Sequence, residues 1–435
     1  MQDVSSWGRL GPVPHEIRRP AFLDEAQNAV QSPGPPRLCF GLGRSYGDVC
    51  LNANGRLIVT DTLDRIISFD RERGILRAEA GLSLERLLRI AVPTGWFPPV
   101  VPGTKFVTLG GAVANDVHGK NHESVGTLGA HVTALGLARS DGRVLTLSHT
   151  ENGELFAATI GGLGLTGMIL WVELQLAPVQ SAMIDSETLR LKNLADFFDV
   201  SEESTDWPYR VAWIDCLAKG SAAGRGFYIR GRHAESGGIA VHRSPRLAAP
   251  LDAPGWLLNM HTIGLFNTTY FHRPFVLGLK RVHYEPFFFP LDVVANWNRL
   301  YGKHGFFQHQ SVIPMAGAFD ALRRLLQLTA EFGEGSFLVV LKLFGDKPSP
   351  GLLSFPMPGA TLALDFPNKG ESTRRLLDRM AEVVLSAGGR LYPAKDATMS
   401  GKAFRTGYPA WRKLEAARDP AIMSDFWRRV TTEAA

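Results

Sequence analysis

The glycine-rich run at residues 41–48 has residue types that could bind a phosphorylated cofactor. Glycine lacks the Cβ atom that would hold a pyrophosphate away from backbone N–H groups. A loop that binds a nicotinamide dinucleotide would have a third glycine in place of Tyr46 and an amphipathic helix directly after it. One feature does fit that interpretation: Asp61 lies about twenty residues further on. Residues 49–55 instead contain turn formers and no helical apolar period. We therefore predict a loop that binds a diphosphate through its backbone, with no helix following.

A second glycine-rich stretch lies at residues 102–129. Residues 110–112 and Ala114 are small, so a large planar ligand could lie against the backbone there. A tightly packed turn between strands would use the same residue types. Because the stretch is too long for a plain connector, we predict an irregular segment that contributes to the same ligand site.

The bulk composition describes an ordinary globular protein. With 435 residues, two domains are expected, and 45% hydrophobic and 20% charged residues indicate a well-formed core. Lys and Arg exceed Asp and Glu by 47 − 42 = 5 without any basic block, so no nucleic-acid partner is predicted. The three cysteines have no metal-ligand spacing, and we predict neither a signal peptide nor a transmembrane helix.

Sequence patterns around the two loops predict short strands with interspersed helices, as in an α+β protein. Ser83 can cap a helix with one apolar face, which Pro93 and Gly95 end, and Asp141-Gly142 is typical of a hairpin turn. Aromatic residues become denser after about residue 180, which indicates a second domain. Strands are predicted near residues 56–60, 66–69, 75–79, 167–176, 308–313 and 337–344, and a helix at 371–386.

An ordered set of motifs resembles the vanillyl-alcohol-oxidase type of FAD enzymes over nearly the whole chain. The motifs are residues 41–48, 118–122, 164–167, 307–310, 344–345, 365–367 and 391–396. The resemblance implies a two-domain, PCMH-type FAD-binding fold of the α+β class with an antiparallel-sheet substrate domain. Residues 1–181 and 390–435 would form the FAD-binding domain, and residues 182–389 the substrate-binding domain.

The resemblance also implies which residues hold the cofactor. Relatives that attach the flavin covalently often have a histidine at the position of Arg44, so we expect non-covalent FAD. The implied FAD-binding residues are Gly41, Leu42, Gly43, Arg44, Ser45, Tyr46, Gly47, Gly103, Thr108, Leu109, Gly110, Gly111, Asn115, Asp116, Val117, His118, Ile169 and Tyr392.

Within this family the sequence is most similar to enzymes that oxidise the 2′-hydroxyl of a polyprenylphosphoryl-β-D-ribose to a 2′-ketone. That resemblance implies a lipid-linked substrate, a separate NAD(P)H-dependent short-chain reductase, and peripheral contact with the inner membrane. The cytoplasmic side is favoured over the periplasmic side. The alternatives are an FAD-dependent oxidase of a free sugar, alditol or aldonolactone, and a non-catalytic nucleotide- or lipid-binding protein.

Lys395 is the first candidate for a catalytic role. An alcohol needs a base or a strong hydrogen-bond acceptor to lose its proton, and a lysine in a dry pocket can have a lowered pKa. A charged Lys395 could instead stabilise the reduced flavin, and the plain alternative is a surface lysine. Tyr392 and Lys395 are three residues apart, with Pro393 between them. The tyrosine–lysine pair of short-chain dehydrogenases needs a four-residue spacing on a helix, so that pair is ruled out here.

The other candidates lie in the same motifs. His118 and Lys342 are assigned catalytic roles beside Lys395, and no metal site is predicted because Gly119 and Asn121 disfavour a helix that would pair His118 with His122. The candidate substrate-binding residues are Lys120, Trp213, Gln308, Gln310 and Lys342.

Two further features bear on ligands. Some family members have a cysteine, known as a target of nitroaromatic inhibitors, where this sequence has Ala363, so no covalent adduct is expected. The aromatic segment 256–289 is either core or an apolar lip where a polyprenyl tail leaves the membrane.

Overall fold

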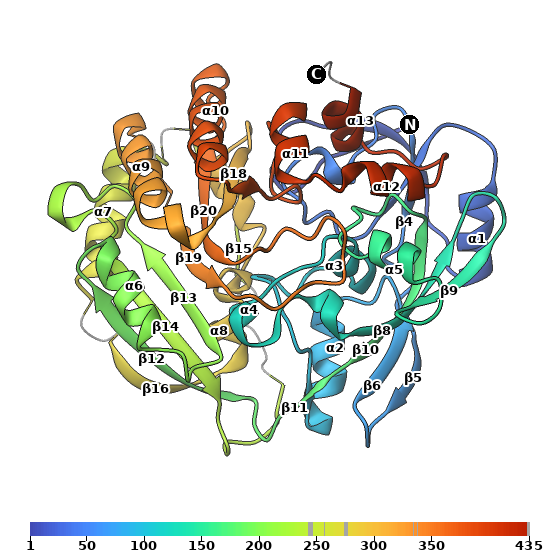
Figure 1. Cartoon of the computed structure of the whole chain (residues 1–435), viewed down its shortest axis with the longest axis horizontal. Coiled ribbons are helices and arrows are strands. Elements are labelled where there is room, and N and C mark those ends of the chain that lie inside the picture. The colour runs from blue at the N-terminus through green and yellow to red at the C-terminus, as the bar shows by residue number, and fades with distance from the viewer. Residues whose placement is uncertain (242–246, 256, 274–276, 334, 337, 433–435) are drawn as a thin grey trace.

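The computed structural model describes residues 1–241, 247–255, 257–273, 277–333, 335–336 and 338–432. The chain forms two α+β parts side by side, with the N-terminal part and the C-terminal helices on one side and a large sheet on the other (Figure 1). Among the described residues, no helix combines the length and the apolar character needed to cross a membrane.

The N-terminal part contains two sheets. The first has the order β1-β2-β4-β3, with β3 parallel to β4, and the second is an antiparallel sheet with the order β5-β6-β10-β8-β9. The strands are β1 (Gln2–Val4), β2 (Val13–Arg18), β3 (Arg37–Phe40), β4 (Arg56–Val59), β5 (Ile66–Asp70), β6 (Ile75–Glu79), β8 (Val132–Ala138), β9 (Val144–Ser148) and β10 (Met168–Gln175). The helices are α1 (Leu23–Gln31), α2 (Leu84–Ala91), α3 (Leu109–Ala114), α4 (His122–Val125) and α5 (Gly153–Thr159). β7 (Trp96–Phe97) and β11 (Ala177–Pro178) form a separate short pair.

Several local predictions are confirmed. Ser83 caps α2, accepting a hydrogen bond from the N–H of Arg86 at 3.2 Å. The hairpin at Asp141-Gly142 joins β8 and β9, and only a single 3₁₀ turn, residues 48–50, follows the glycine loop before β4. The stretch 102–129 is less irregular than predicted, because α3 forms there in spite of its two glycines. Thr108 caps that helix through Oγ1, which accepts from the N–H of Gly111 at 3.1 Å.

The second part is an eight-stranded antiparallel sheet with the order β16-β12-β14-β13-β19-β20-β18-β21. Its strands are β12 (Met183–Leu191), β13 (Tyr209–Ile214), β14 (Gly226–His233), β16 (Gly278–His283), β18 (Phe306–Ile313), β19 (Val339–Phe344), β20 (Gly359–Pro367) and β21 (Arg390–Leu391). Its helices are α6 (Leu194–Glu202), α7 (Met260–Phe271), α8 (Tyr284–Phe288), α9 (Met315–Phe332) and α10 (Glu371–Ser386). The short strands β15 (Leu247–Ala248) and β17 (Val294–Ala295) pair beside this sheet.

Alternation along the central strands gives this sheet two different faces. On β20, Leu362 and Leu364 point into a core shared with α6, α9 and α10. Ala363 and Asp365, at the alternate positions, line a cavity on the opposite face. The sheet is therefore apolar where helices cover it and carries functional groups where it faces the N-terminal part.

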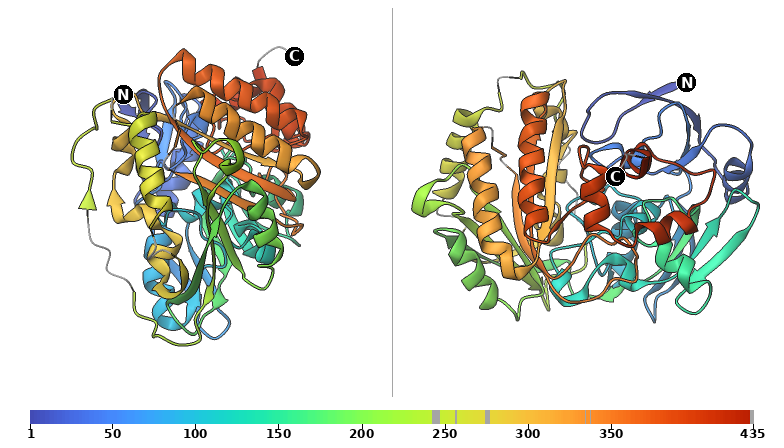
Figure 2. Two further views of the ribbon diagram at one scale, coloured as in Figure 1. Left: turned by 90° about the vertical axis from the view of Figure 1, so that its left-hand side faces the viewer. Right: turned by 45° about the horizontal axis from the view of Figure 1, so that its top comes forward.

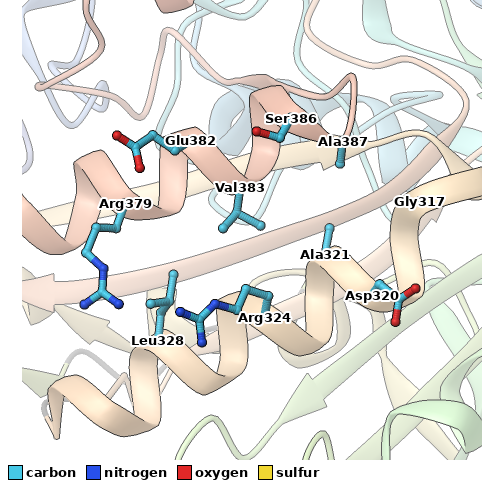
Figure 3. Close-up of a pocket in the computed structure, with 10 residues that line it drawn as sticks. All are labelled: Gly317, Asp320, Ala321, Arg324, Leu328, Arg379, Glu382, Val383, Ser386 and Ala387. Atoms are coloured by element: carbon cyan, nitrogen blue, oxygen red, sulfur yellow. The ribbon is translucent and has the colours of Figure 1, made fainter.

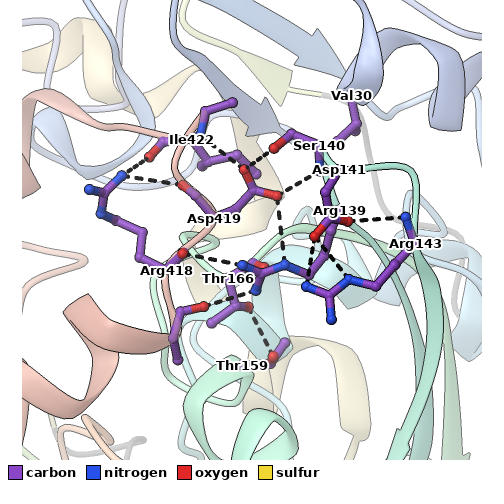
Figure 4. A network of polar contacts seen from close by, with 12 residues as sticks. Val30, Arg139, Ser140, Asp141, Arg143, Thr159, Thr166, Arg418, Asp419 and Ile422 are labelled. Atoms are coloured by element: carbon purple, nitrogen blue, oxygen red, sulfur yellow. Dashed lines mark hydrogen bonds and ion pairs between the residues drawn. The ribbon is translucent and has the colours of Figure 1, made fainter.

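The C-terminal helices α11 (Gly401–Gly407), α12 (Trp411–Ala417) and α13 (Asp425–Thr432) lie over the N-terminal part (Figure 2). A buried polar network fixes the connecting segment there (Figure 4). Asp419, fully buried, accepts from the N–H and hydroxyl of Ser140 at 2.7 and 2.6 Å. Arg139 donates to the carbonyls of Thr166 and Ala417, each at 2.9 Å. The end of the chain is thus bonded to the β8–β9 hairpin and, through the N–H of Asp419 and the carbonyl of Leu165, to the loop that precedes β10.

Candidate active site

A cavity of about 380 Å³ lies between the N-terminal part and the open face of the eight-stranded sheet. Its walls come from the glycine loop, the 102–120 stretch, the loop before β10, the strands β18, β19 and β20, and residues 392–395. A second hollow, of about 500 Å³, is a groove between α9 and α10 (Figure 3). Charged side chains such as Arg324, Arg379 and Glu382 line that groove, and none of the predicted site residues does.

Most of the predicted residues line the first cavity. From the cofactor set these are Gly41, Leu42, Gly43, Arg44, Ser45, Tyr46, Gly103, Thr108, Gly110, Gly111, Asn115, Val117, His118, Ile169 and Tyr392. From the catalytic and substrate sets they are Lys120, Gln308, Gln310, Lys342 and Lys395.

Four predicted residues lie outside the cavity wall. Leu109 is fully buried in the hydrophobic core of the N-terminal part. Asp116 is fully buried too, and its carboxylate accepts from the N–H of Gly129 at 2.8 Å and from the hydroxyls of Ser349 and Ser354. Asp116 therefore joins the two parts of the protein, which explains its place in a motif without ligand contact.

Gly47 and Trp213 are the other two. A Cβ atom on Gly47 would lie 1.8 Å from the carbonyl oxygen of Asp396, so this glycine is needed for close backbone packing. Trp213 follows the cavity-lining Val211 on the same face of β13, but its ring packs edge-on against Tyr270 of α7, with 4.7 Å between centroids. Both residues are held by contacts between distant segments, which a motif does not reveal.

The glycine loop meets the requirements of a diphosphate cradle. Over the described residues, the N–H groups of residues 41–45 donate to no other group of the chain. A Cβ at Gly41 would lie 2.5 Å from Oγ1 of Thr108, so the two glycine segments touch here. Gly103 and Gly164, in contrast, have no atom within 4 Å of an added Cβ, and side chains there would enter the cavity. The free N–H groups of the glycine loop could bind the diphosphate of FAD, and the bare backbone at Gly103 and Gly164 leaves room for its planar rings.

Arg44 and Trp7 close one end of this wall. The guanidinium carbon lies 3.9 Å from the centre of the Trp7 ring, and burial lowers the pKa of Arg44, although the nearby Asp292 carboxylate opposes that shift. Asp292 also holds the 104–105 segment, accepting from the hydroxyl of Thr104 at 2.8 Å and from the N–H of Lys105 at 2.9 Å. An arginine in this position offers positive charge and no nucleophile for a flavin bond.

Three lysines meet in the cavity. Nζ of Lys342 donates to the carbonyl of Gly119 at 3.0 Å, and Nζ of Lys120 to the carbonyl of Phe288 at 3.2 Å. Burial lowers the pKa of Lys120 to about 8. Burial, with the like charges of Lys120 and Lys395, lowers the pKa of Lys342 to about 7. The cluster thus favours an anionic ligand that would supply the missing negative charge.

Lys395 lies over the face of Tyr46, with Nζ 3.8 Å from the ring centre. Burial lowers its pKa, and the negative charge of Asp365 acts in the opposite direction. Asp365 is 1% exposed, and burial raises the pKa of its carboxyl. Asp365 was not among the predicted site residues, although it lies in the 365–367 motif. Because strand residues alternate between the two faces, Asp365 and Ala363 share the cavity face, and this alternation could have identified it.

His118 is enclosed by aromatic rings. Its ring centre lies 4.8 Å from that of Phe344 and 5.4 Å from that of Tyr392, and Nε2 lies 3.1 Å from Nε2 of Gln310. Nδ1 is buried and has no hydrogen-bond partner within the described part of the chain, and burial places the pKa of His118 well below its usual range. A neutral imidazole with a free ring nitrogen can therefore bond to a ligand in the cavity.

Comparisons with known proteins agree with this geometry. The family described as FAD binding domain matches residues 18–148. Decaprenylphosphoryl-beta-D-ribose oxidase of Mycolicibacterium smegmatis is 32% identical over 98% of this chain and 97% of its own length. An uncharacterized Streptomyces coelicolor protein, encoded in the mprA 5′ region, is 33% identical over 80% of this chain and all of its own. Mouse L-gulonolactone oxidase is 29% identical over 40% of this chain and 39% of its own.

Proposed function

The chain belongs to the family of FAD-dependent oxidoreductases that includes decaprenylphosphoryl-β-D-ribose oxidase, and we propose that it oxidises the ribose 2′-hydroxyl of a polyprenylphosphoryl-β-D-ribose. The product would be the 2′-keto sugar. A separate NAD(P)H-dependent short-chain reductase would then reduce this ketone from the other face, which completes epimerisation to the arabinose donor. The observation that carries the proposal is the convergence of three lysine amines on one flavin-sized site.

When bound, FAD supplies the hydride acceptor for this oxidation. Oxidation removes a hydride from the carbon and a proton from its hydroxyl, and Lys395 is the group we assign to that proton. Its pKa, lowered to about 8, leaves about a tenth of the amine neutral at pH 7, and this neutral fraction can accept a proton. The amine lies over the face of the Tyr46 ring, and the charge of Asp365 acts on it.

Lys120 and Lys342 are assigned to the phosphate of the substrate. Each amine is fixed by a backbone carbonyl and keeps further N–H donors for a ligand oxygen. Gln308 and Gln310 project from β18 into the same space and can bind sugar hydroxyls. A free lactone or alditol would leave the two lysines without an anion, which is why we favour a sugar phosphate.

The polyprenyl tail is assigned to exposed apolar side chains on α7, β15 and β16. Leu265 is 70% exposed, Leu279 68% and Leu247 61%, whereas Phe288 and Phe289 of the same predicted lip are buried core residues. Exposed apolar side chains of this kind fit peripheral contact with the inner membrane, where the cytoplasmic face is favoured over the periplasmic face. The predicted lip, residues 256–289, includes residues 256 and 274–276, which lie outside the described residues.

Anaerobic titration of the flavoprotein tests the substrate. Prenylphosphoryl ribose is expected to bleach the visible absorbance of the flavin, while gulonolactone and a free alditol leave it unchanged. Lys395→Met is expected to slow bleaching about 100-fold or more with flavin still bound. Bleaching by the lactone or alditol alone would overturn the assignment to a lipid-linked ribose.

Chain-length dependence tests the tail site separately. Leu265→Glu is expected to raise KM for a long-chain substrate about tenfold and to leave KM for a water-soluble ribosyl phosphate unchanged. Val144→Glu, on β9 and 47% exposed, is the matched control. Equal KM changes with both substrates would remove α7 from the tail site.

A further inference from the structure

Arg429, on the C-terminal helix α13, bridges two segments that border the flavin cavity. Its Nε and Nη2 atoms donate to the two carboxylate oxygens of Asp48 at 2.9 and 2.8 Å. Nη2 also lies 3.5 Å from Oδ2 of Asp396, and Nη1 donates to the carbonyl of Met399. Asp48 ends the glycine loop and Asp396 follows Lys395, so one guanidinium joins the diphosphate loop to the lysine segment.

The backbones of these two segments are also in direct contact. The N–H of Tyr46 donates to the carbonyl of Ala394 at 3.0 Å, and Gly47 packs against the carbonyl of Asp396 so closely that no Cβ would fit. The Lys395 amine rests on the Tyr46 ring. Any change in the separation of the segments would therefore move the amine relative to the loop.

Two like charges oppose this close approach. Burial raises the pKa of Asp396, the Arg429 charge lowers it, and the Asp48 carboxylate raises it again. Without the guanidinium, two partly buried carboxylates would face each other across the contact. A bidentate arginine is the side chain best suited to hold both, because its fork has fixed geometry and permanent charge.

We propose that Arg429 is a positioning residue that holds the glycine loop against the Lys395 segment, and so determines both the affinity for FAD and the placement of the Lys395 amine. Arg429 itself is not among the residues lining the cavity. Its influence passes through Asp48 and Asp396, neither of which lines the cavity wall.

The test uses the apoprotein, so that it does not depend on the substrate. Arg429→Met is expected to raise the Kd for FAD, measured by fluorescence titration, about tenfold or more. Acylation of Lys395 with acetic anhydride, followed by peptide mass mapping, is expected to become several-fold faster because the amine leaves the Tyr46 ring. Arg429→Lys, which keeps the charge and loses the fork, is expected to fall between the parent and Arg429→Met.

Arg428→Met is the matched control. Arg428 is on the same helix and also bonds carboxylate and amide oxygens, of Asp425 at 2.6 Å and Asn52 at 3.0 Å, away from the Lys395 segment. Its Kd for FAD and its Lys395 labelling are expected to match the parent. A lowered Tm in Arg429→Met with both readouts unchanged would overturn the proposal. Should that variant fail to fold, Arg429→Lys and Arg428→Lys carry the same comparison.

Discussion

Gln308 and Asp365 lie directly opposite each other on β18 and β20, and the Gln308 amide donates to Oδ1 of Asp365. The hydroxyl of Tyr301 donates to Oδ2 at 3.4 Å. The carboxyl is therefore fixed from both sides within the cavity wall. It is also the acid whose charge acts on Lys395.

Asp365→Asn is expected to lower the pKa of Lys395 further, because the neutral amide no longer stabilises the ammonium form. The acid limb of the pH profile for flavin reduction, which requires a neutral amine, should then move to lower pH by about one unit. Rapid-reaction spectroscopy across pH measures this limb. A profile that keeps its acid limb in Asp365→Asn would show that the carboxylate does not control the amine.

Lys342→Met is expected to stabilise the apoprotein by a few degrees in Tm at pH 7, because burial and like charges disfavour the ammonium form. The folded pKa of about 7 lies below the ordinary 10.5, so the lysine's contribution to stability is greatest above pH 10.5 and is lost as pH falls through 7. The gain from the substitution should thus shrink between pH 7 and pH 10. Thermal melts at both pH values check the sign, and an equal gain at both would contradict it.

Gly103→Val is expected to weaken FAD binding at least tenfold with little change in Tm, since an added Cβ points into the cavity with no protein atom within 4 Å. Gly153→Ala, at the first residue of α5, is the control, because its Cβ also has room but lies outside the cavity. Fluorescence titration of both apoproteins gives the Kd values. Normal affinity in Gly103→Val would remove the 102–104 segment from the flavin site.

Treatment with a nitroaromatic inhibitor in the presence of substrate is expected to leave the protein mass unchanged. Ala363 lines the cavity and has no thiol. The cavity is also lined by Cys39 and Cys50, and burial raises the pKa of each thiol to about 12, so both stay protonated. Ala363→Cys should gain the adduct. Intact-protein mass spectrometry distinguishes the outcomes, and an adduct on the parent would refute the expectation.

Acid precipitation is expected to release the flavin into the supernatant as FAD, because Arg44 has no nucleophilic nitrogen for a covalent bond. Absorbance and mass of the supernatant identify the chromophore. Flavin retained in the pellet would mean that another residue attaches it.

Local sequence signals predicted the parts of the fold that depend on local contacts. The cap at Ser83, the hairpin at residues 141–142 and the strands around residues 308 and 340 follow from capping, turn chemistry and alternation. Helix α3 was missed because glycine propensity outweighed the Thr108 cap in the sequence interpretation.

Motifs predicted which segments meet at the cavity, since Gly43 and Lys395 both line its wall, while their roles stay predictions. Motif membership could not separate ligand contact from structural contact, so Gly47 and Asp116 were assigned to the cofactor although they join distant segments. Trp7 and Asp292 were missed because they reach the site from outside the motifs, through tertiary packing alone.

The tail of the chain supplies a wall of the flavin cavity, through Tyr392, Ala394 and Lys395, and the Asp419 network secures it to the first part. During synthesis, the ribosome therefore releases the glycine loop several hundred residues before its opposite wall exists. FAD therefore binds late in biogenesis, because a nascent N-terminal fragment has the glycine loop but lacks the opposite wall of the cavity.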